Sequence, residues 1–140
     1  MFGYKPDVFY LDLEQPLSIQ DRTLSFDILH HVGVLYHLTN PVEHLYSICK
    51  QIKVGIMLDT HVASSSDSLK NYVVDEKEYS YKEYWEGGRA EPFSGMKEHA
   101  KWLLESDLLA ILEDCGFNNI DIAERREERN GLRVLIYAYR

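Results

Sequence analysis

The chain has 140 residues, of which 45% are apolar, and this length and composition fit one domain with a real hydrophobic core. Its formal net charge of −8 argues against binding of nucleic acid through the general field of the protein, although a local basic patch is compatible with it. No apolar run approaches the ~20 residues that cross a bilayer, and the N-terminus lacks the pattern of a signal peptide. The sequence therefore predicts a single domain, residues 1–140, in the cytoplasm.

Two short segments precede the central part of the chain. Residues 8–13 (VFYLDL) are apolar except for Asp12, and they predict a strand. Residues 14–23 are polar and include Pro16, and they predict a loop that crosses the edge of the sheet.

The stretch 26–60 organises the rest of the chain, and it predicts a strand, a helix and a second strand. Residues 26–34 form an apolar run that holds two histidines and reaches Gly33, as expected of a strand that is buried on both faces and then turns. Residues 54–58 form the second apolar run. A helix between two such strands is the crossover of a parallel pair, which other elements must cover.

Three start signals place the beginning of that helix. Asn40 is a favoured N-cap, Pro41 stands at the first helical position, and Glu43 at the third can reach back to the Asn40 backbone. Apolar residues then recur at helical spacing and predict one buried face.

Residues 64–95 carry tyrosine and tryptophan side chains among lysine and glutamate, without a regular period. A segment with aromatic anchors but no core of its own is typical of a lid or an insertion over a site. We therefore expect residues 64–95 to form a lid within the single domain.

The C-terminal part predicts a second helix. Ser106 is expected to cap it, Asp107 lies in its positive first turn, and Gly116 is expected to end it as the C′ residue. Cys49 and Cys115 are each in or at the end of a helical pattern and lack the spacing of a disulfide framework or a metal site, so we expect buried free thiols.

A hairpin is predicted to close the chain. Residues 119–123 and 132–139 are strand-like, and residues 124–131 between them are expected to be a charged turn. The pair Asn130-Gly131 in this turn is a hairpin signal, so the two strands are predicted to be antiparallel.

Several of these motifs together carry a resemblance to a known family. The series consists of a strand that opens with FD, the sequence GVLYHL, a Pro-led helix, an apolar strand that ends in Asp59 and Thr60, a helix that ends in CGF, and the hairpin. It resembles the second half of a class I S-adenosylmethionine-dependent methyltransferase. The pattern is most similar to the branch that contains the tRNA wobble-uridine carboxymethyltransferase, and it covers roughly residues 8–139.

The resemblance implies an α/β fold with an incomplete Rossmann-like sheet. This sheet is expected to be mostly parallel, with a C-terminal antiparallel hairpin and helices packed on its faces. The ligand of such an open sheet lies across the carboxyl ends of its strands.

The front half of the family's domain has no counterpart in this sequence. The glycine-rich turn G-x-G-x-G and the acidic residue that holds the ribose hydroxyls are both absent. We therefore expect a truncated domain that begins at the family's third strand. Loss of two strands would leave the edge of strand 26–32 open, so we expect either residues 8–13 or another chain to pair with it.

The resemblance implies S-adenosyl-L-methionine as the cofactor. Asp12, followed by Leu13, is at the position where the family has an Asp that accepts from the adenine amino group, and a loop-capping Asp is the alternative. Gly33 follows the central strand where the family's backbone passes the methionine part, and a turn glycine is the alternative. His31 is predicted to face the ligand crevice, and a packing histidine is the alternative.

The implied reaction is transfer of a methyl or related alkyl group from a sulfonium. Such a transfer depends on in-line alignment more than on acid or base, so few residues are diagnostic of it. Three histidines are candidates to take a proton from an oxygen or nitrogen nucleophile, namely His31, His37 and His61.

Four residues are predicted to contact the substrate. Tyr36 and Asp59 follow the two central strands at their carboxyl ends, although Tyr36 also fits an anchor that packs the helix start. Trp85 belongs to the expected aromatic lid, where a ring can lie near a sulfonium cation. Arg89 is the nearest cation that could meet a carboxylate or phosphate.

No metal is predicted, because the spacing of His37, Asp59 and His61 matches no known zinc pattern. The predicted function is alkyl transfer to a small-molecule or nucleoside acceptor by a domain that is incomplete on its own. The alternative is a catalytically silent, methyltransferase-like module that associates through its exposed sheet edge. A homo-oligomer or a companion chain is the expected protein partner, with no nucleic acid or membrane partner.

Overall fold

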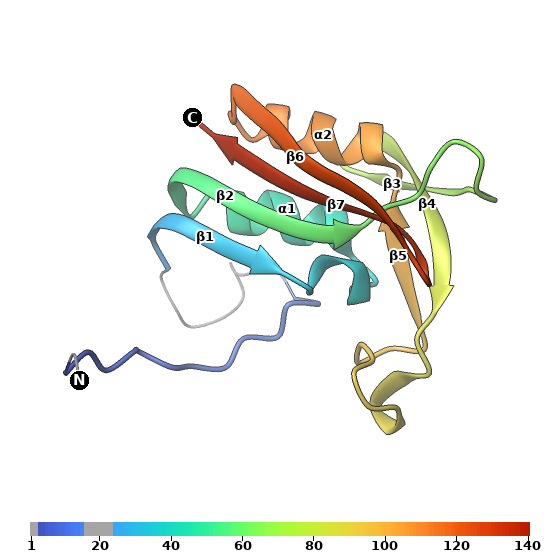
Figure 1. The fold of residues 1–140 in the computed structure, drawn as a ribbon, viewed down its shortest axis with the longest axis horizontal. Coiled ribbons are helices and arrows are strands. Elements are labelled where there is room, and N and C mark those ends of the chain that lie inside the picture. The colour runs from blue at the N-terminus through green and yellow to red at the C-terminus, as the bar shows by residue number, and fades with distance from the viewer. Residues whose placement is uncertain (1–2, 16–23) are drawn as a thin grey trace.

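The computed structural model describes residues 3–15 and 24–140 (Figure 1). They form two sheets and two α-helices. The elements in chain order are β1 Phe26–Val32, α1 Pro41–Cys49, β2 Ile52–His61, β3 Lys70–Val74, β4 Lys77–Trp85, β5 His99–Leu103, α2 Glu105–Asp114, β6 Asn119–Glu128 and β7 Gly131–Tyr139, with short 3-10 turns at Leu35–His37 and Gly88–Ala90.

The larger sheet has four strands in the order β1-β2-β7-β6. β1 and β2 are parallel with α1 as their crossover, as predicted from residues 26–60. The other two pairs, β2 with β7 and β6 with β7, are antiparallel. The α/β class is therefore confirmed. The expectation of a mostly parallel sheet is wrong, because among the described strands only β1 and β2 form a parallel pair in this sheet.

The first helix begins where its sequence signals place it. Pro41 is the first helical residue and Asn40 the N-cap, whose carbonyl accepts the His44 N–H at 3.0 Å. The Asn40 side chain makes no capping hydrogen bond, so the helix start rests on the Pro41 backbone and on packing rather than on a capping box.

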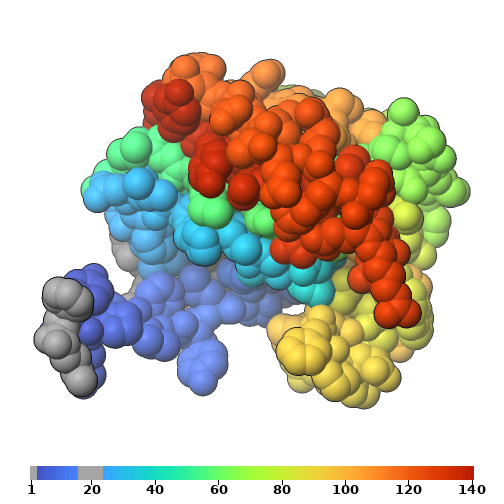
Figure 2. Space-filling model, in the orientation of Figure 1, coloured from blue at the N-terminus to red at the C-terminus, as the bar shows by residue number. Residues whose placement is uncertain are grey.

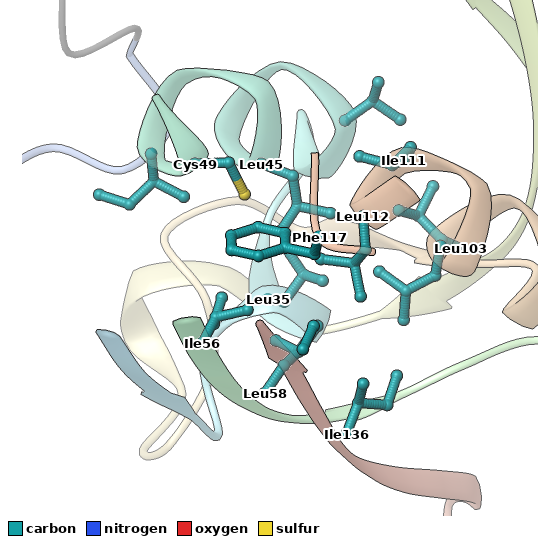
Figure 3. Packing of buried hydrophobic residues seen from close by; sticks show 14 of the residues in the cluster. Leu35, Leu45, Cys49, Ile56, Leu58, Leu103, Ile111, Leu112, Phe117 and Ile136 are labelled. Carbon is teal, nitrogen blue, oxygen red and sulfur yellow. The ribbon is translucent and has the colours of Figure 1, made fainter. Parts of the chain in front are cut away.

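Both helices pack on the same face of the four-stranded sheet, behind the strands in Figure 1. Figure 3 shows Phe117 below Leu45 of α1, beside Leu112 of α2 and above Leu58 of β2. All four side chains are fully buried. The core is thus one layer of helices on one layer of strands, and the expectation of helices on both faces is wrong.

The opposite face of this sheet is covered by a described element only near the carboxyl end of β2, where Trp102 of β5 stacks on His61. Ile28, Met57 and Tyr137 are on it, because β-strand side chains alternate and residue 28 pairs with 55 while 57 pairs with 137. Ile28 is 68% exposed. This surface, which we call the open face, is turned toward the viewer in Figures 1 and 2.

Residues 8–13 do not form the predicted strand and do not pair with β1, so that expectation is wrong. Phe9, Leu11 and Leu13 are instead partly buried against the core. The Glu14 carboxylate accepts the backbone N–H of Thr39 at 3.0 Å and its hydroxyl at 2.7 Å. Side chains rather than a ladder thus hold this segment. Of the predicted loop 14–23, residues 16–23 are outside the described residues.

Residues 64–95 are more regular than their sequence pattern indicated. They contain β3 and β4, which join β5 in a three-stranded antiparallel sheet. Asp75 and Glu76 form the hairpin turn with positive φ angles of 48° and 66°, which is the turn type that suits the twist of two strands. The aromatic period is that of a strand, because Tyr79 and Tyr81 are both buried on one side. The role of this segment as a lid stays a prediction.

The C-terminal elements differ from expectation at their ends. β6 runs to Glu128, so most of the predicted charged turn is strand, and the loop before Gly131 has two residues. The antiparallel hairpin itself is confirmed. Ser106 does not cap α2, whose first residue is Glu105, and Asp107 in the first turn accepts the Ser80 N–H at 2.6 Å.

Gly116 ends α2 as predicted. Its φ is +89°, its N–H donates to Glu113 O at 2.8 Å, and the Phe117 N–H donates to Leu112 O at 3.1 Å. These two bonds form the motif that satisfies the last carbonyls of a helix. Both cysteines are free thiols, with Cys49 buried and Cys115 half-buried.

We expect Gly116→Ala to lower the free energy of unfolding by about 1–2 kcal/mol, because a Cβ disfavours the left-handed conformation. The added Cβ would also lie 2.7 Å from an Arg140 nitrogen. Urea unfolding followed by circular dichroism measures the change. Gly3→Ala is the matched control, because a Cβ there meets nothing within 4 Å. Equal stability of the two variants would contradict this assignment.

Candidate functional site

Two cavities adjoin the carboxyl end of β1. The first, which we call the N-segment cavity, has a volume of about 260 Å³ and lies between residues 11–14, residues 33–38 and residues 94–96. Figure 2 shows the hollow between the N-terminal segment and the residues near 90. Its lining includes leucines as well as the small residues Gly33, Ser94 and Gly95.

Three of the predicted cofactor residues line this cavity, namely Asp12, Leu13 and Gly33. Asp12 Oδ1 accepts the Glu14 N–H at 3.0 Å, which is the loop-capping role given as its alternative, and the residue also faces the cavity. Gly33 has a φ of +72°, and its N–H donates to Asp59 O at 3.0 Å. Gly33 is therefore a turn glycine at the end of β1, and a Cβ would be strained there.

The second cavity, the aromatic cavity, has a volume of about 350 Å³. Its inner wall is a stack of three rings in which Trp102 lies between Tyr84, at 4.2 Å, and His61, at 4.5 Å. Tyr36 meets His61 edge-on at 4.8 Å, and its carbonyl accepts the Trp102 indole N–H at 3.0 Å. Trp85, 62% exposed, lies at its rim.

His37 lines both cavities and is held by a buried carboxylate. Its Nδ1 lies 2.9 Å from Glu86 Oε2, and the same oxygen accepts the Gly95 N–H at 2.9 Å. Glu86 is only 8% exposed. A carboxylate accepts hydrogen bonds, so Nδ1 carries the proton in the neutral ring and Nε2 is left as the basic atom.

Asp59 and His61 are on the open face of β2, near the aromatic cavity. The Asp59 carboxylate forms ion pairs with Arg133 and, at 3.2 Å, with Arg126. His61 Nδ1 donates to Leu132 O at 3.2 Å, and burial lowers the pKa of His61. Asp59 is therefore held by two arginines, and His61 is packed into the ring stack.

His31 is separate from both cavities. Its Nε2 lies 2.9 Å from His44 Nε2 of α1, inside the core layer. Burial lowers the pKa of His31 to about 4, and burial together with the neighbouring His31 lowers the pKa of His44 to about 3. Both rings are thus neutral at pH 7, and His31 corresponds to the packing alternative. Arg89 is exposed and lines neither cavity.

The structure brings together most of the predicted site residues, but it adds partners that sequence reasoning missed. Glu86 directly follows β4, Trp102 belongs to β5 and Arg133 to β7, so all three are far from His37 in the sequence. A signal for Arg133 exists, because a charged residue interrupts an otherwise apolar strand. Nothing in the spacing of Glu86 distinguishes it from its charged neighbours.

Two further findings concern the described residues only. No three His, Cys, Asp or Glu side chains among them gather in a way that would hold a metal ion. Within residues 3–15 and 24–140, neither helix has the length and apolar character needed to span a membrane.

The fold places the chain in a class of proteins. Its mixed sheet with one layer of helices is similar to the solved N-terminal domain of EvdMO1. The structure of that domain in the presence of SAH and D-fucose matches with a TM-score of 0.69 and 27% identity, over 92% of this chain and 50% of that one. A second structure of the domain, with SAH bound, has a TM-score of 0.68 and 28% identity, over 92% and 49% of the two chains. The chain has a methyltransferase-like α/β fold.

Sequence relatives narrow the class further. The tRNA U34 carboxymethyltransferase of Tolumonas auensis is 25% identical over 87% of this chain and 32% of its own length. The tRNA U34 carboxymethyltransferase of Shewanella denitrificans is 29% identical over 75% of this chain and 28% of its own length. No family model matches the sequence. This chain is thus related to the S-adenosylmethionine-dependent methyltransferases of the branch that includes these enzymes, as its motifs predicted, and it spans about a third of their length.

The buried histidine pair predicts acid sensitivity. The ordinary pKa of 6.5 falls in the folded state to about 4 for His31 and about 3 for His44, so between pH 6.5 and 4 the unfolded chain binds protons that the folded chain does not. Folding stability therefore falls with falling pH in this window, by on the order of 1 kcal/mol per pH unit for each histidine.

Urea titrations at several pH values test this dependence. The double variant with His31→Leu and His44→Leu is expected to show a flatter slope between pH 4 and 6.5. His30→Gln, at the exposed neighbouring position, is the control and should keep the slope of the unmodified protein. An unchanged slope in the double variant would show that other groups cause the acid sensitivity.

Proposed function

We propose that this chain supplies one half of an S-adenosylmethionine-dependent methyltransferase, which moves a methyl or related alkyl group to a small-molecule or nucleoside acceptor. One observation carries the proposal. Asp12, Leu13 and Gly33 converge on one cavity at the carboxyl end of β1, and His37 separates this cavity from a second, aromatic one.

The N-segment cavity is proposed as the cofactor side. The carboxyl ends of strands are where open α/β sheets hold their ligands, and the related EvdMO1 domain was solved with SAH, the demethylated form of the cofactor. Asp12 offers a carboxylate to the adenine amino group, and Gly33 keeps the wall free of a side chain. When bound, S-adenosyl-L-methionine supplies an electrophilic carbon on a sulfonium.

The aromatic cavity is proposed as the acceptor side. Tyr36 and Trp85, two of the predicted substrate contacts, line it. Asp59, a third, does not line the cavity but forms an ion pair with Arg133, which does. Rings exclude water and give an acceptor flat surfaces to pack on. Arg89 is exposed outside this wall, so we assign it no contact with the acceptor.

We propose that the full reaction needs residues outside these 140. Half of the EvdMO1 domain has no counterpart in this chain. Apolar side chains at Ile28 and Tyr137 remain exposed on the open face. The free edge of β1 borders this face. A polypeptide segment from outside these 140 residues could pair with that edge and also cover the open face.

A second candidate function is a silent binding module. The observation that favours it is the same open face, which has apolar residues beside an unpaired strand edge among the described elements. Such a surface associates with polypeptide whether or not a cofactor binds.

Binding of SAH to the purified chain tests the cofactor proposal. We expect amide shifts in the ¹H–¹⁵N NMR spectrum, confined to residues 11–14 and 33–38, at millimolar SAH. A sensitive method is needed because one half of a site binds weakly. Asp12→Ala should reduce these shifts, and Asp7→Ala, outside the cavity, should not. Absence of any shift at millimolar SAH would refute cofactor binding by this chain and leave the binding module.

Association through the open face has a separate test. Sedimentation equilibrium of the chain at about 100 µM is expected to show a species heavier than the monomer, since apolar sheet edges self-associate. Ile28→Lys should weaken this association at least tenfold. Val73→Lys is the control, because Val73 is 64% exposed but belongs to the smaller sheet. A monomer at every concentration would exclude self-association as the role of this face.

A further inference from the structure

We propose that the aromatic cavity binds a neutral, polyhydroxylated ring, that is, a sugar unit, and that one of its hydroxyl groups gives its proton to His37, which Glu86 holds in place. The proposal deepens the proposed function, since it names the acceptor class of the same site. It rests on three observations about the cavity.

The first observation is that each charged side chain of the aromatic cavity already has a partner. Glu86 accepts from His37 and from a backbone N–H. Glu128 accepts from Arg126 at 2.8 Å and lies 3.5 Å from Arg133, which is also paired with Asp59. Among the described residues, no charged side chain of this wall lacks a partner and so remains to neutralise a phosphate or carboxylate, and the cavity therefore favours an uncharged ligand.

The second observation is the combination of rings and short polar groups. Trp85 and Phe93 are exposed aromatic residues in the lining, and Phe93 is 98% exposed. A sugar has apolar C–H faces that pack on such rings, and hydroxyl groups around its edge that need donors and acceptors. Asn130 and Ser94 line the same cavity: the Asn130 amide has both a donor and an acceptor, and the Ser94 hydroxyl, which donates to Glu86 O, can accept. Its volume of about 350 Å³ accommodates one such ring.

The third observation is the position of His37. It is the member of the predicted catalytic set that lines both cavities, whereas His61 lines the aromatic cavity alone and His31 is paired inside the core. Because the Glu86 carboxylate accepts a hydrogen bond from Nδ1–H, Nε2 of the neutral ring is the atom that can accept a proton at the boundary between donor and acceptor.

The chemical step balances with these groups. The acceptor oxygen forms a bond to the alkyl carbon as the bond from that carbon to the sulfonium sulfur breaks, and the electron pair of the broken bond stays on sulfur as a neutral thioether. The hydroxyl proton moves to Nε2 of His37, where the Glu86 carboxylate stabilises the resulting imidazolium. His37 is thus the catalytic base, and Glu86 is a positioning residue.

Tryptophan fluorescence tests the ligand class without requiring a cofactor. The chain has two tryptophans, Trp85 and Trp102, and both line the aromatic cavity. Excitation at the red edge of tryptophan absorption therefore reports on this cavity alone. We expect a saturable change with methyl β-D-galactopyranoside or with uridine, and at least a tenfold weaker effect of galactose 6-phosphate.

The arms of the titration separate the sources of the sugar. A change with the galactoside assigns a hexose, and a change with uridine but not with uracil assigns the ribose of a nucleoside. If uracil changes the fluorescence as much as uridine does, the cavity binds the base rather than the sugar, and the proposal is overturned. It is also overturned if the phosphate binds better, or if no sugar has an effect at 50 mM. SAH binding in the N-segment cavity is measured separately, so the two proposals fail independently.

The role of Glu86 has its own readout. ¹⁵N NMR of the histidine rings is expected to show His37 with its proton on Nδ1, and Glu86→Gln is expected to shift the neutral ring toward the Nε2–H form. Glu91→Gln, at an exposed position of the same segment, is the matched control and should leave the tautomer unchanged. The positioning role is refuted if His37 keeps its tautomer in Glu86→Gln while that variant stays folded.

Discussion

The parallel pairing of β1 with β2 is the constraint on which both cavities depend. It places Val32 opposite Asp59, so the two strands end at the same edge of the sheet, and the Gly33 N–H extends the ladder by one more bond to Asp59 O. The chain that leaves β1 at this edge carries His37, and β7 enters at the same edge with Arg133 opposite His61. The side chains of the site are therefore gathered by backbone hydrogen bonds before any side-chain contact is made.

The two faces of the sheet have different roles. On the covered face, Leu58 and Ile136 pack under the helices, and the free energy of folding comes mainly from this layer. On the open face, the charged network of Asp59, Arg126 and Arg133 gives way to apolar side chains toward the other end of the strands. Another polypeptide could pack on the apolar end of this surface. The charged end beside the cavities would then stay open to solvent, so the site would remain accessible.

His37 connects the proposed donor and acceptor sides because of where the smaller sheet lies. The residue after β4, Glu86, reaches the 3-10 turn that follows β1 and fixes the imidazole, and its oxygen also holds Gly95. A Cβ at Gly95 would lie 2.5 Å from the His37 carbonyl oxygen, so the close approach of these two segments requires glycine. The segment 64–95 thus contributes part of the site wall, as well as the strands that support it.

The sequence alone determined the elements whose signals are local. The crossover unit, the helix start at Pro41 and the left-handed residue at Gly116 follow from short patterns, because capping, proline geometry and positive φ depend on neighbouring residues only. The resemblance to methyltransferases and three of the cavity residues, Gly33, Tyr36 and His37, also followed from the central stretch. Only the tertiary structure decided that residues 8–13 are held by side chains and that both helices share one face. It alone paired Glu86 with His37, because a contact across 49 positions depends on how the two sheets pack and leaves no periodic trace in the sequence.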